Sequence, residues 1–304
     1  MSTPVRLVVF LGVLAAVLVA GLGLGQAIGP IGPASSSASH GEAVAADDHA
    51  DDGGQAEDDA GGHADDGDHA EQPTGVTGLA VSEGGYTFRP GTTRLVVGTQ
   101  DFRFTVAGPD GAPVTAYDAT HERDLHLIVV RRDTSGFQHL HPEQGDDGTW
   151  STPLTLDAPG AYRAYADFAP EGEPARTLAV DLVVPGEYAP EPLPAPSRTA
   201  EVDGYTVTLD GDLRSGDLVF EVTRDGRPVD DLEPYLGAGG HLVVLREGDL
   251  GYLHVHPEGD LDTGPEIAFV AEAPSDGRYR LFLQFQHGGA VRTAAFTADT
   301  EETP

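Results

Sequence analysis

The sequence contains no cysteine and no lysine, and its single methionine is Met1. The absence of cysteine excludes disulfide bonds, thiolate metal sites and cysteine nucleophiles. Because the only thioether belongs to the initiator, a blue-copper electron carrier is also excluded, and a dedicated copper(I) site is disfavoured. All 17 basic residues are therefore arginines, against 50 acidic residues.

The formal net charge of −33 narrows the range of partners. Electrostatic binding of nucleic acid or of an anionic lipid surface requires a basic patch, so we expect no nucleic-acid partner. Cations are the expected partners of such a chain. An acidic, lysine-free composition is equally expected of a salt-adapted or high-GC source, and so the charge alone does not establish a function.

Residues 1–34 contain a run of nineteen residues without a polar side chain, Leu7–Gly25, directly after Arg6. About 20 apolar residues span a bilayer. We therefore predict a single transmembrane anchor in the cell membrane, with the amino terminus cytoplasmic and the rest of the chain outside the cytoplasm. The alternative is a cleaved secretory signal, with Ala43–Ala45 as its cleavage site, which would make the protein secreted.

Residues 35–75 have the composition of a linker. Twelve acidic residues lie between Glu42 and Glu71, and almost no apolar side chain is larger than alanine. Such a segment cannot bury enough surface to fold, so we predict a disordered His/Asp-rich linker. Its histidines could capture divalent cations weakly, or the segment could be a solvated spacer. They are His40, His49, His63 and His69.

The remaining sequence predicts an all-β fold. Short β-branched and aromatic runs, such as those at 79–81 and 94–97, are broken by Gly, Pro and Asp, and no amphipathic helix is present. This pattern is typical of β-sandwiches. We predict two tandem Ig-like β-sandwich domains, 76–186 and 198–300, joined by a stiff Pro-rich connector at 187–197.

An internal repeat supports this partition. The segment Asp110–Glu143 recurs 115 residues later as Asp225–Glu258 without a gap, and 13 of the 34 aligned positions are identical. Three histidines recur at the same spacing in both copies. They are His126, His139 and His141 in the first copy and His241, His254 and His256 in the second.

The spacing has geometric content, because the histidines flank a turn-rich segment between two predicted strands. In the hairpin that this predicts, His126 lies opposite His141, and His139 faces Ile128. Residues two apart on a strand point to the same side, and directly opposed residues share a face with Cβ atoms about 4.5–5.5 Å apart. The three imidazoles should therefore converge, and the second copy predicts the same for its own three.

Three converging imidazoles with an open coordination position suit zinc or copper(II). We therefore predict one copper(II) or zinc cluster in each domain. Additional ligands or hydrogen-bond partners of ligands are expected among nearby acids and one histidine. These are Glu143, Asp167, Glu258 and His287. Gln284 stands where the first domain has Asp167, so the two clusters would differ in charge.

The alternative is structural. His126 and His241 would be core residues of the hairpins, and each His-x-His-Pro would be a packed turn fixed by hydrogen bonds. His121 has Leu236 as its counterpart in the repeat and is expected to be peripheral. No nucleophile elbow and no phosphate-binding glycine loop is present, so we do not expect an enzyme.

The repeated segments carry a family resemblance. The stretches DLHLIVVRRDTSGFQHLHPE and PYLGAGGHLVVLREGDLGYLHVHPE resemble a group of actinobacterial membrane-anchored exported proteins, usually labelled secreted or heavy-metal-binding. The likeness extends from about Leu79 to Thr297 and implies a pair of extracytoplasmic β-sandwiches. This sequence departs from the group at Gln284, where an acid is usual.

These observations predict a membrane-anchored extracytoplasmic protein that binds divalent metal ions for homeostasis or protection. The alternative is a metal-free structural or interaction module of the cell envelope, whose sandwich edges hold a protein partner.

Overall fold

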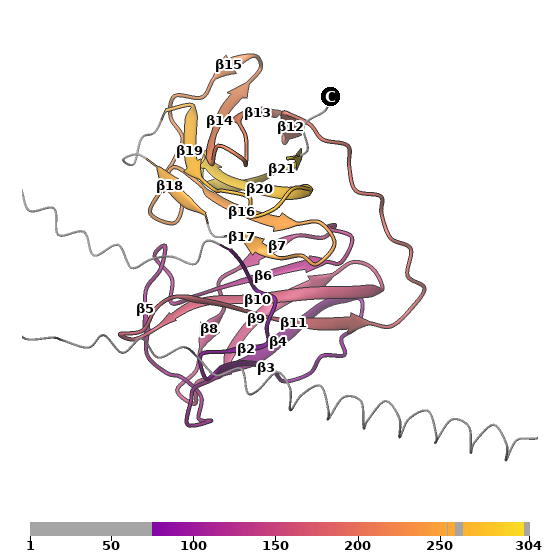
Figure 1. The fold of residues 1–304 in the computed structure, drawn as a ribbon, viewed down its shortest axis with the longest axis vertical. Coiled ribbons are helices and arrows are strands. Elements are labelled where there is room, and N and C mark those ends of the chain that lie inside the picture. Colours follow the sequence, from indigo (N-terminus) through magenta and orange to yellow (C-terminus); the bar gives the residue numbers. More distant parts are fainter. Residues whose placement is uncertain (1–74, 254, 259–263, 301–304) are drawn as a thin grey trace, which may run out of the picture. The chain divides into compact units, whose positions relative to one another are not determined.

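The computed structural model describes residues 75–253, 255–258 and 264–300. These residues form strands and loops without a helix, which confirms the predicted all-β class (Figure 1). No helix in these ranges is long and apolar enough to cross a bilayer. The predicted anchor, and the predicted linker up to residue 74, lie outside the described residues.

The first domain is a sandwich of two antiparallel sheets. One sheet has the strand order β2 (Ser82–Glu83), β3 (Tyr86–Pro90), β4 (Gly98–Ala107), β9 (Trp150–Leu156), β8 (Glu143–Gln144). The other has the order β11 (Arg176–Val184), β10 (Gly160–Pro170), β6 (Leu125–Arg131), β7 (Gln138–Leu140), with β5 (Tyr117–Asp118) on β10. Between them lies an apolar core in which Phe88 and Phe104 meet edge to face.

The second domain repeats this architecture. One sheet has the order β12 (Thr199–Val202), β13 (Tyr205–Gly211), β14 (Asp217–Arg224), β19 (Glu266–Val270), β18 (His256–Glu258), with β15 (Arg227–Pro228) on β14. The other has the order β1 (Val76–Thr77), β17 (Tyr252–Leu253), β16 (His241–Arg246), β20 (Arg278–His287), β21 (Ala290–Asp299). Its core includes Phe220 and Phe269.

The two domains are joined by a third apolar cluster, called the shared core below. It lies between the outer face of the β6–β10 sheet and that of the β16–β20 sheet. Its buried members are Ile128, Val130, Tyr165, Ala179, Val243, Leu245, Leu250, Tyr252 and Phe282. The rings of Phe137 and Phe282 stack across it with centroids 4.1 Å apart. The sandwiches therefore pack on each other instead of standing apart on a spacer.

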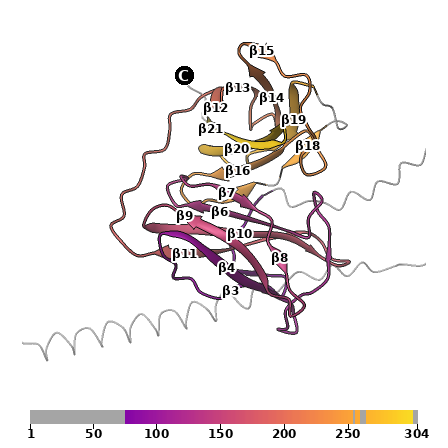
Figure 2. The same ribbon diagram turned by 180° about the vertical axis from the view of Figure 1, so that it is seen from behind.

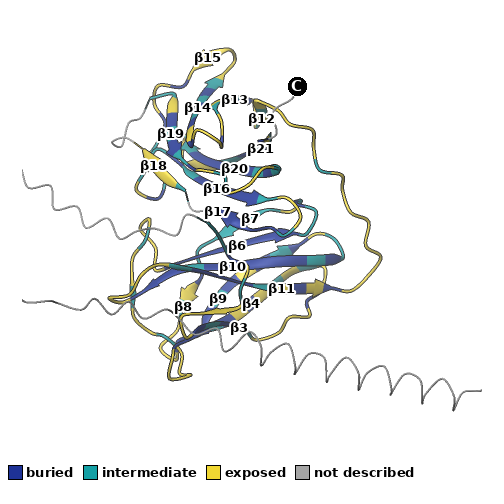
Figure 3. Ribbon diagram, in the orientation of Figure 1, coloured by how far each residue is buried: buried dark blue, intermediate teal, exposed yellow. Residues whose placement is uncertain are grey.

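Both faces of β6 are covered as a result. All seven of its residues are buried, and β6 and β10 are predominantly buried in Figure 3. Leu127 and Val129 belong to the core of the first sandwich, while Ile128 and Val130 belong to the shared core. Because side chains alternate along a strand, His126 lies on the shared-core side.

The predicted hairpin register is confirmed in the first domain. Ile128 pairs with His139, and Leu127 with Leu140. In the second domain the first part is also confirmed, since Val244 pairs with Leu253. The expected strands at 79–81 and 94–97 are instead irregular segments bound along β11. Their contacts include hydrogen bonds from Ala179 N to Ala80 O and from Leu95 N to Val183 O.

The connector at 187–197 runs without regular structure along the outside of the molecule, from β11 to β12, in both ribbon views (Figures 1 and 2). An ion pair of the first domain holds it. Arg131 and Asp133, 2.7 Å apart, have side chains only 4% exposed. Arg131 donates to Ala189 O and lies over the Tyr188 ring, while the Glu191 amide donates to Asp133.

Burial alone would raise the pKa of Asp133, but hydrogen bonds from Ser135 and Glu191 and the charge of Arg131 hold this pKa below its usual value. The stabilisation from these bonds is therefore present above the pKa of an unfolded aspartate, about 3.9. It is lost as the pH falls through the lower folded value.

Replacing Asp133 by Ala should lower the free energy of unfolding by about 3 kcal/mol, because Arg131 would remain buried without its counter-charge. Urea denaturation at neutral pH measures the change. The matched control is Asp101→Ala, which removes an exposed ion pair with Arg103 and should cost within about 0.5 kcal/mol. Equal losses in the two variants would contradict this account of the connector.

Candidate metal centre

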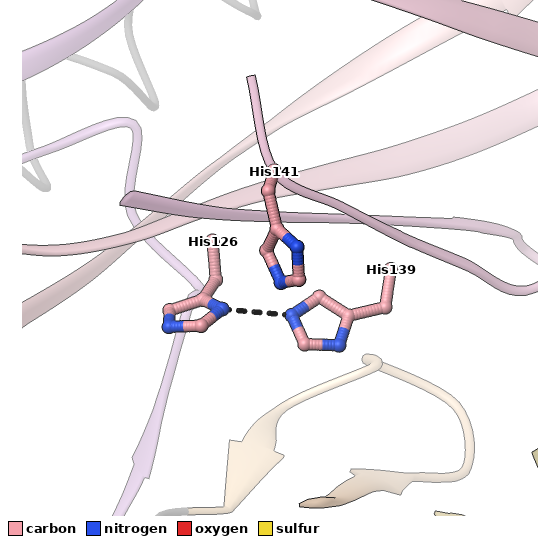
Figure 4. Close-up of side chains that lie close together, drawn as sticks. All are labelled: His126, His139 and His141. Atoms are coloured by element: carbon pink, nitrogen blue, oxygen red, sulfur yellow. Dashed lines mark hydrogen bonds between the residues drawn. The ribbon is translucent and has the colours of Figure 1, made fainter. Parts of the chain in front are cut away.

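Three histidines of the first domain meet at the edge of the shared core (Figure 4). His126 lies on β6 and His139 on β7, and His141 follows β7 directly. The ring centroids are 5.0 Å apart for His126 and His139, 5.2 Å for His126 and His141, and 4.9 Å for His139 and His141. One nitrogen from each ring lies within 4.8 Å of the other two. The predicted convergence is confirmed, and we call these residues the triad.

Hydrogen bonds assign the protons of two neutral rings. His126 Nε2 is 2.9 Å from the carbonyl oxygen of Thr120, which can only accept, so Nε2 carries the proton. His139 Nδ1 is 2.6 Å from Oε1 of Gln284, and so carries a proton for the same reason. In the neutral rings, His126 Nδ1 and His139 Nε2 therefore face each other at 2.9 Å as two lone pairs.

The third ring adds another unsatisfied nitrogen. His141 Nε2 is buried and has no hydrogen-bond partner among the described residues. Buried polar atoms are rarely left unpaired, and each such atom costs free energy. Unpaired ring nitrogens that converge in this way offer a cation the lone pairs that it requires, so the residues present fit a metal ion.

The electrostatics keep the rings in the form that can bind metal. Burial, and next the charge of His126, lowers the pKa of His139 to about 3. Burial and the same neighbour lower the pKa of His141 to about 4. Burial also lowers the pKa of His126. All three imidazoles are thus neutral at pH 7, as ligation requires.

The second domain contributes to this cluster and does not build its own from the described residues. His241 lies on β16, and its ring centroid is 4.6 Å from that of His139 and 5.6 Å from that of His126. The predicted pairing of His241 with His256 across the hairpin is wrong. His256 is exposed on β18 and pairs with Val270 in the other sheet.

The reason for this correction is the position at which the chain changes sheet. In the first copy β7 continues to Leu140, and the chain joins β9 only at Glu143. β17 ends at Leu253, and by His256 the chain has joined β19. His254 lies between these strands and is outside the described residues. His241 is instead brought to the triad by the shared core, because Val243 and Leu245 alternate with it on β16 and face the first domain.

His121, expected to be peripheral, joins the cluster. Its ring centroid is 5.5 Å from that of His241 and 6.0 Å from that of His126. It lies in a tight turn closed by Thr120 and Arg123, with positive φ at both His121 and Glu122. The same backbone turn recurs with φ 56° at Leu236. Nothing in the sequence indicated the direction of this turn, and the leucine counterpart argued against a role.

The other predicted site residues divide into two groups. Asp167 pairs with His126 in the strand register and lines a cavity of about 30 Å³ together with His121 and His241. Thr177 donates a hydrogen bond to its carboxylate. A cavity of that volume has room for a water molecule.

Glu143, Glu258 and His287 are not brought to the triad. Both glutamates are exposed, on β8 and β18. The two ring nitrogens of His287 are bonded to Tyr205 Oη and Asp231 Oδ1, at 2.6 and 3.1 Å. Spacing along the sequence suggested these three as ligands, but each lies on a strand or face that points elsewhere.

The profile of a domain of unknown function, DUF8832, matches this chain twice, at residues 80–186 and 200–302. No curated protein matches the chain.

Solved structures with a similar outline share little sequence. The Escherichia coli adhesin FdeC aligns at 15% identity with a TM-score of 0.26, over 73% of this chain and 66% of that one. A Salmonella alpha-2-macroglobulin aligns at 16% identity with a TM-score of 0.25, over 73% of this chain and 15% of that one. The Ig1-2 module of the Drosophila receptor tyrosine phosphatase DLAR aligns at 6% identity with a TM-score of 0.20, over 71% of this chain and 99% of that module. The chain spans less than two thirds of the first two, and likenesses at this level carry no argument about function.

The triad predicts a pH dependence of folding in the presence of a chelator. Histidines of an unfolded chain have a pKa of about 6.5, so below that pH the unfolded state binds more protons than the folded state. The stabilisation is complete above about pH 6.5 and is lost as the pH falls toward the folded values of about 3 for His139 and about 4 for His141. The free energy of unfolding should fall by about 3 kcal/mol between pH 6.5 and 5.

Urea denaturation across this range tests the slope. His139→Leu should flatten it, because one of these groups is gone. An identical slope in wild type and His139→Leu would contradict the assignment of the pH dependence to the triad.

Proposed function

We propose that this chain, which belongs to the DUF8832 family of domains of unknown function, binds one divalent cation, copper(II) or zinc, at the triad of His126, His139 and His141. The observation that carries the proposal is the convergence of three rings, each with one nitrogen within 4.8 Å of the other two. Two of the ring nitrogens, His126 Nδ1 and His139 Nε2, face each other at 2.9 Å, and the buried His141 Nε2 has no hydrogen-bond partner among the described residues. When bound there, the ion would take its ligands from these rings and leave a position open for another group.

The donor set favours these two metals. Imidazole suits zinc and copper(II), whereas calcium and magnesium prefer oxygen ligands. The predicted acidic partners Glu143 and Glu258 are exposed on strands that do not reach the triad, so no carboxylate from them changes this preference. The net charge of −33 raises the local concentration of cations around the chain, and this supports capture at low metal concentration.

We place this activity outside the cytoplasm, in metal homeostasis or protection. The basis is the apolar run Leu7–Gly25 and the resemblance to membrane-anchored exported proteins. The absence of cysteine and of lysine agrees with an acidic exported protein that needs no thiol chemistry. In this role the domains would hold a metal ion at the outer surface of the membrane.

A metal-free envelope module is the second candidate, and one feature of the cluster favours it. If the Gln284 amide presented its NH₂ to His139, protons could be arranged in an unbroken chain from Gln284 through His139 and His126 to Thr120 O. The orientation described above opposes this arrangement, because it leaves the Gln284 NH₂ to donate to Thr293 Oγ1.

The purified full chain, dialysed against copper(II) or zinc and then against a weak chelator, should retain one tight equivalent. His139→Ala should lose it, because His139 makes the 2.9 Å contact with His126 and is itself oriented by the hydrogen bond to Gln284. His256→Ala is the matched control and should retain it, since its side chain is exposed on β18. Metal analysis by mass spectrometry gives the count. Equal retention by wild type and His139→Ala would assign the ion to the linker histidines and sink the proposal.

The variant Gln284→Glu separates the two candidates. A carboxylate can only accept from His139, so it fixes the lone pair on Nε2 and makes the ring a stronger ligand. Metal affinity should rise about 10-fold, since changes in partners of ligands typically alter affinity by 10–100-fold. In the metal-free module, the chain of hydrogen bonds from Gln284 to Thr120 O needs an NH₂ donor at position 284, which glutamate lacks. That candidate therefore predicts no gain in metal affinity for this variant.

The same variant has a second readout in thermal stability. Gln284 is 7% exposed, so the glutamate should destabilise the chelator-treated protein, and added metal should restore its melting temperature. Destabilisation that metal does not reverse would favour the metal-free module.

A further inference from the structure

His241 lies directly beside the triad, closest to His139. Its ring centroid is 4.6 Å from that of His139, whereas His139 and His141 are 4.9 Å apart. It is also 5.6 Å from His126, against 5.2 Å between His126 and His141. By position it belongs to the cluster, although it comes from the other domain.

The strand next to His241, β20, contacts the triad through Gln284. Gln284 of β20 is paired with His241 in the strand register, so both side chains lie on the face turned toward the first domain. Gln284 Oε1 accepts a hydrogen bond from His139 Nδ1, 2.6 Å away, and this leaves His139 Nε2 as the nitrogen with the free lone pair. Two neighbouring positions of the second domain thus contact the same ligand of the first.

This placement is held by the fold. The stacked pair Phe137 and Phe282 and the hydrogen bond from Tyr165 Oη to Leu250 O, 2.6 Å long, fasten the two domains beside the cluster. The cavity of about 30 Å³ that His241 lines has room for a water molecule beside its ring. Burial, and then the charge of His139, lowers the pKa of His241 well below its usual value, so the ring is neutral.

We propose that the cation is held jointly by both repeats, with His241 as its fourth imidazole ligand. This inference rests on the proposed function and adds to it the ligand set and its origin. Four imidazoles suit tetrahedral zinc and tetragonal copper(II). The ion then joins β6 and β7 of the first domain to β16 of the second, and one site serves the duplicated chain.

Copper(II) electron paramagnetic resonance of the full chain tests the ligand set, because nitrogen hyperfine structure reports the number of bound imidazoles. The variants are His241→Leu, which matches the apolar neighbours on β16, and His241→Gln, which keeps a polar side chain. His256→Ala is the control from the same domain. Competition with a chelator gives the affinities for copper(II) and zinc, and circular dichroism checks that each variant is folded.

We expect four nitrogen ligands in wild type and in His256→Ala, three in both His241 variants, and about a 10-fold or greater loss of affinity in those variants. Tight binding with the same spectrum and affinity in the His241 variants, together with loss in His139→Ala, would overturn the joint site and leave the proposed function standing. Three nitrogens in wild type would do the same. Absence of tight copper and zinc binding in wild type would overturn both.

Discussion

The packing of two outer sheet faces against each other is the constraint on which the chemistry of this protein depends. An ordinary sandwich sheet buries one face and leaves the other in water. Here the outer face of β6 carries Ile128 and Val130, which pack against Val243 and Leu245 of the second domain. Any polar side chain on the same face of β6 is therefore buried as well, and His126 is fully so. The shared core thus makes weakly basic imidazoles out of histidines that would otherwise be solvated.

The duplication explains why the two domains meet in this way, and its imperfections explain why they meet at one cluster. Ile128 and Val243 occupy equivalent positions of the repeat, so each domain offers an apolar outer face to the other. The polar positions have diverged. His126 is paired with Asp167 on the neighbouring strand, whereas His241 is paired with Gln284. A neutral amide can approach His139 from the second domain without bringing a buried charge, and the first domain then supplies the remaining rings.

Sequence reasoning reached the parts of this arrangement that are local. The hairpin register followed from the turn and from the alternation of side chains, and it placed His139 opposite Ile128 as the structure has it. The all-β class followed from short runs between turn residues. The sequence did not predict what covers the outer face of β6. The continuous apolar run of β6 indicates burial on both sides, but it does not say whether a helix, a loop or a second domain covers it.

The same limit explains the misplaced residues. The sequence of the second copy continues to His256 as the first copy does to His141, and both copies then change sheet. The second copy leaves its strand after Leu253, two repeat positions earlier than the first copy leaves β7 at Leu140, and it has joined β19 by His256. Nothing in the repeated sequence marks the residue at which the chain changes sheet. His121 was missed for a related reason, since its place depends on a turn with two positive φ angles and not on a strand period.

Preorganisation is the last consequence of the shared core. The strands that carry His126 and His241 each have their other face in the core of their own domain, so the rings are positioned by two packed layers on either side. A cation that binds there orders little of the protein, and little of the interaction free energy is lost to ordering. The same rigidity discriminates among ions. The many carboxylates that give the chain its charge attract calcium and magnesium as readily as copper or zinc, but among the residues that the structure describes the converging ligand atoms of the triad are all imidazole nitrogens. Long-range attraction thus concentrates all cations, and the nitrogen lone pairs select among them.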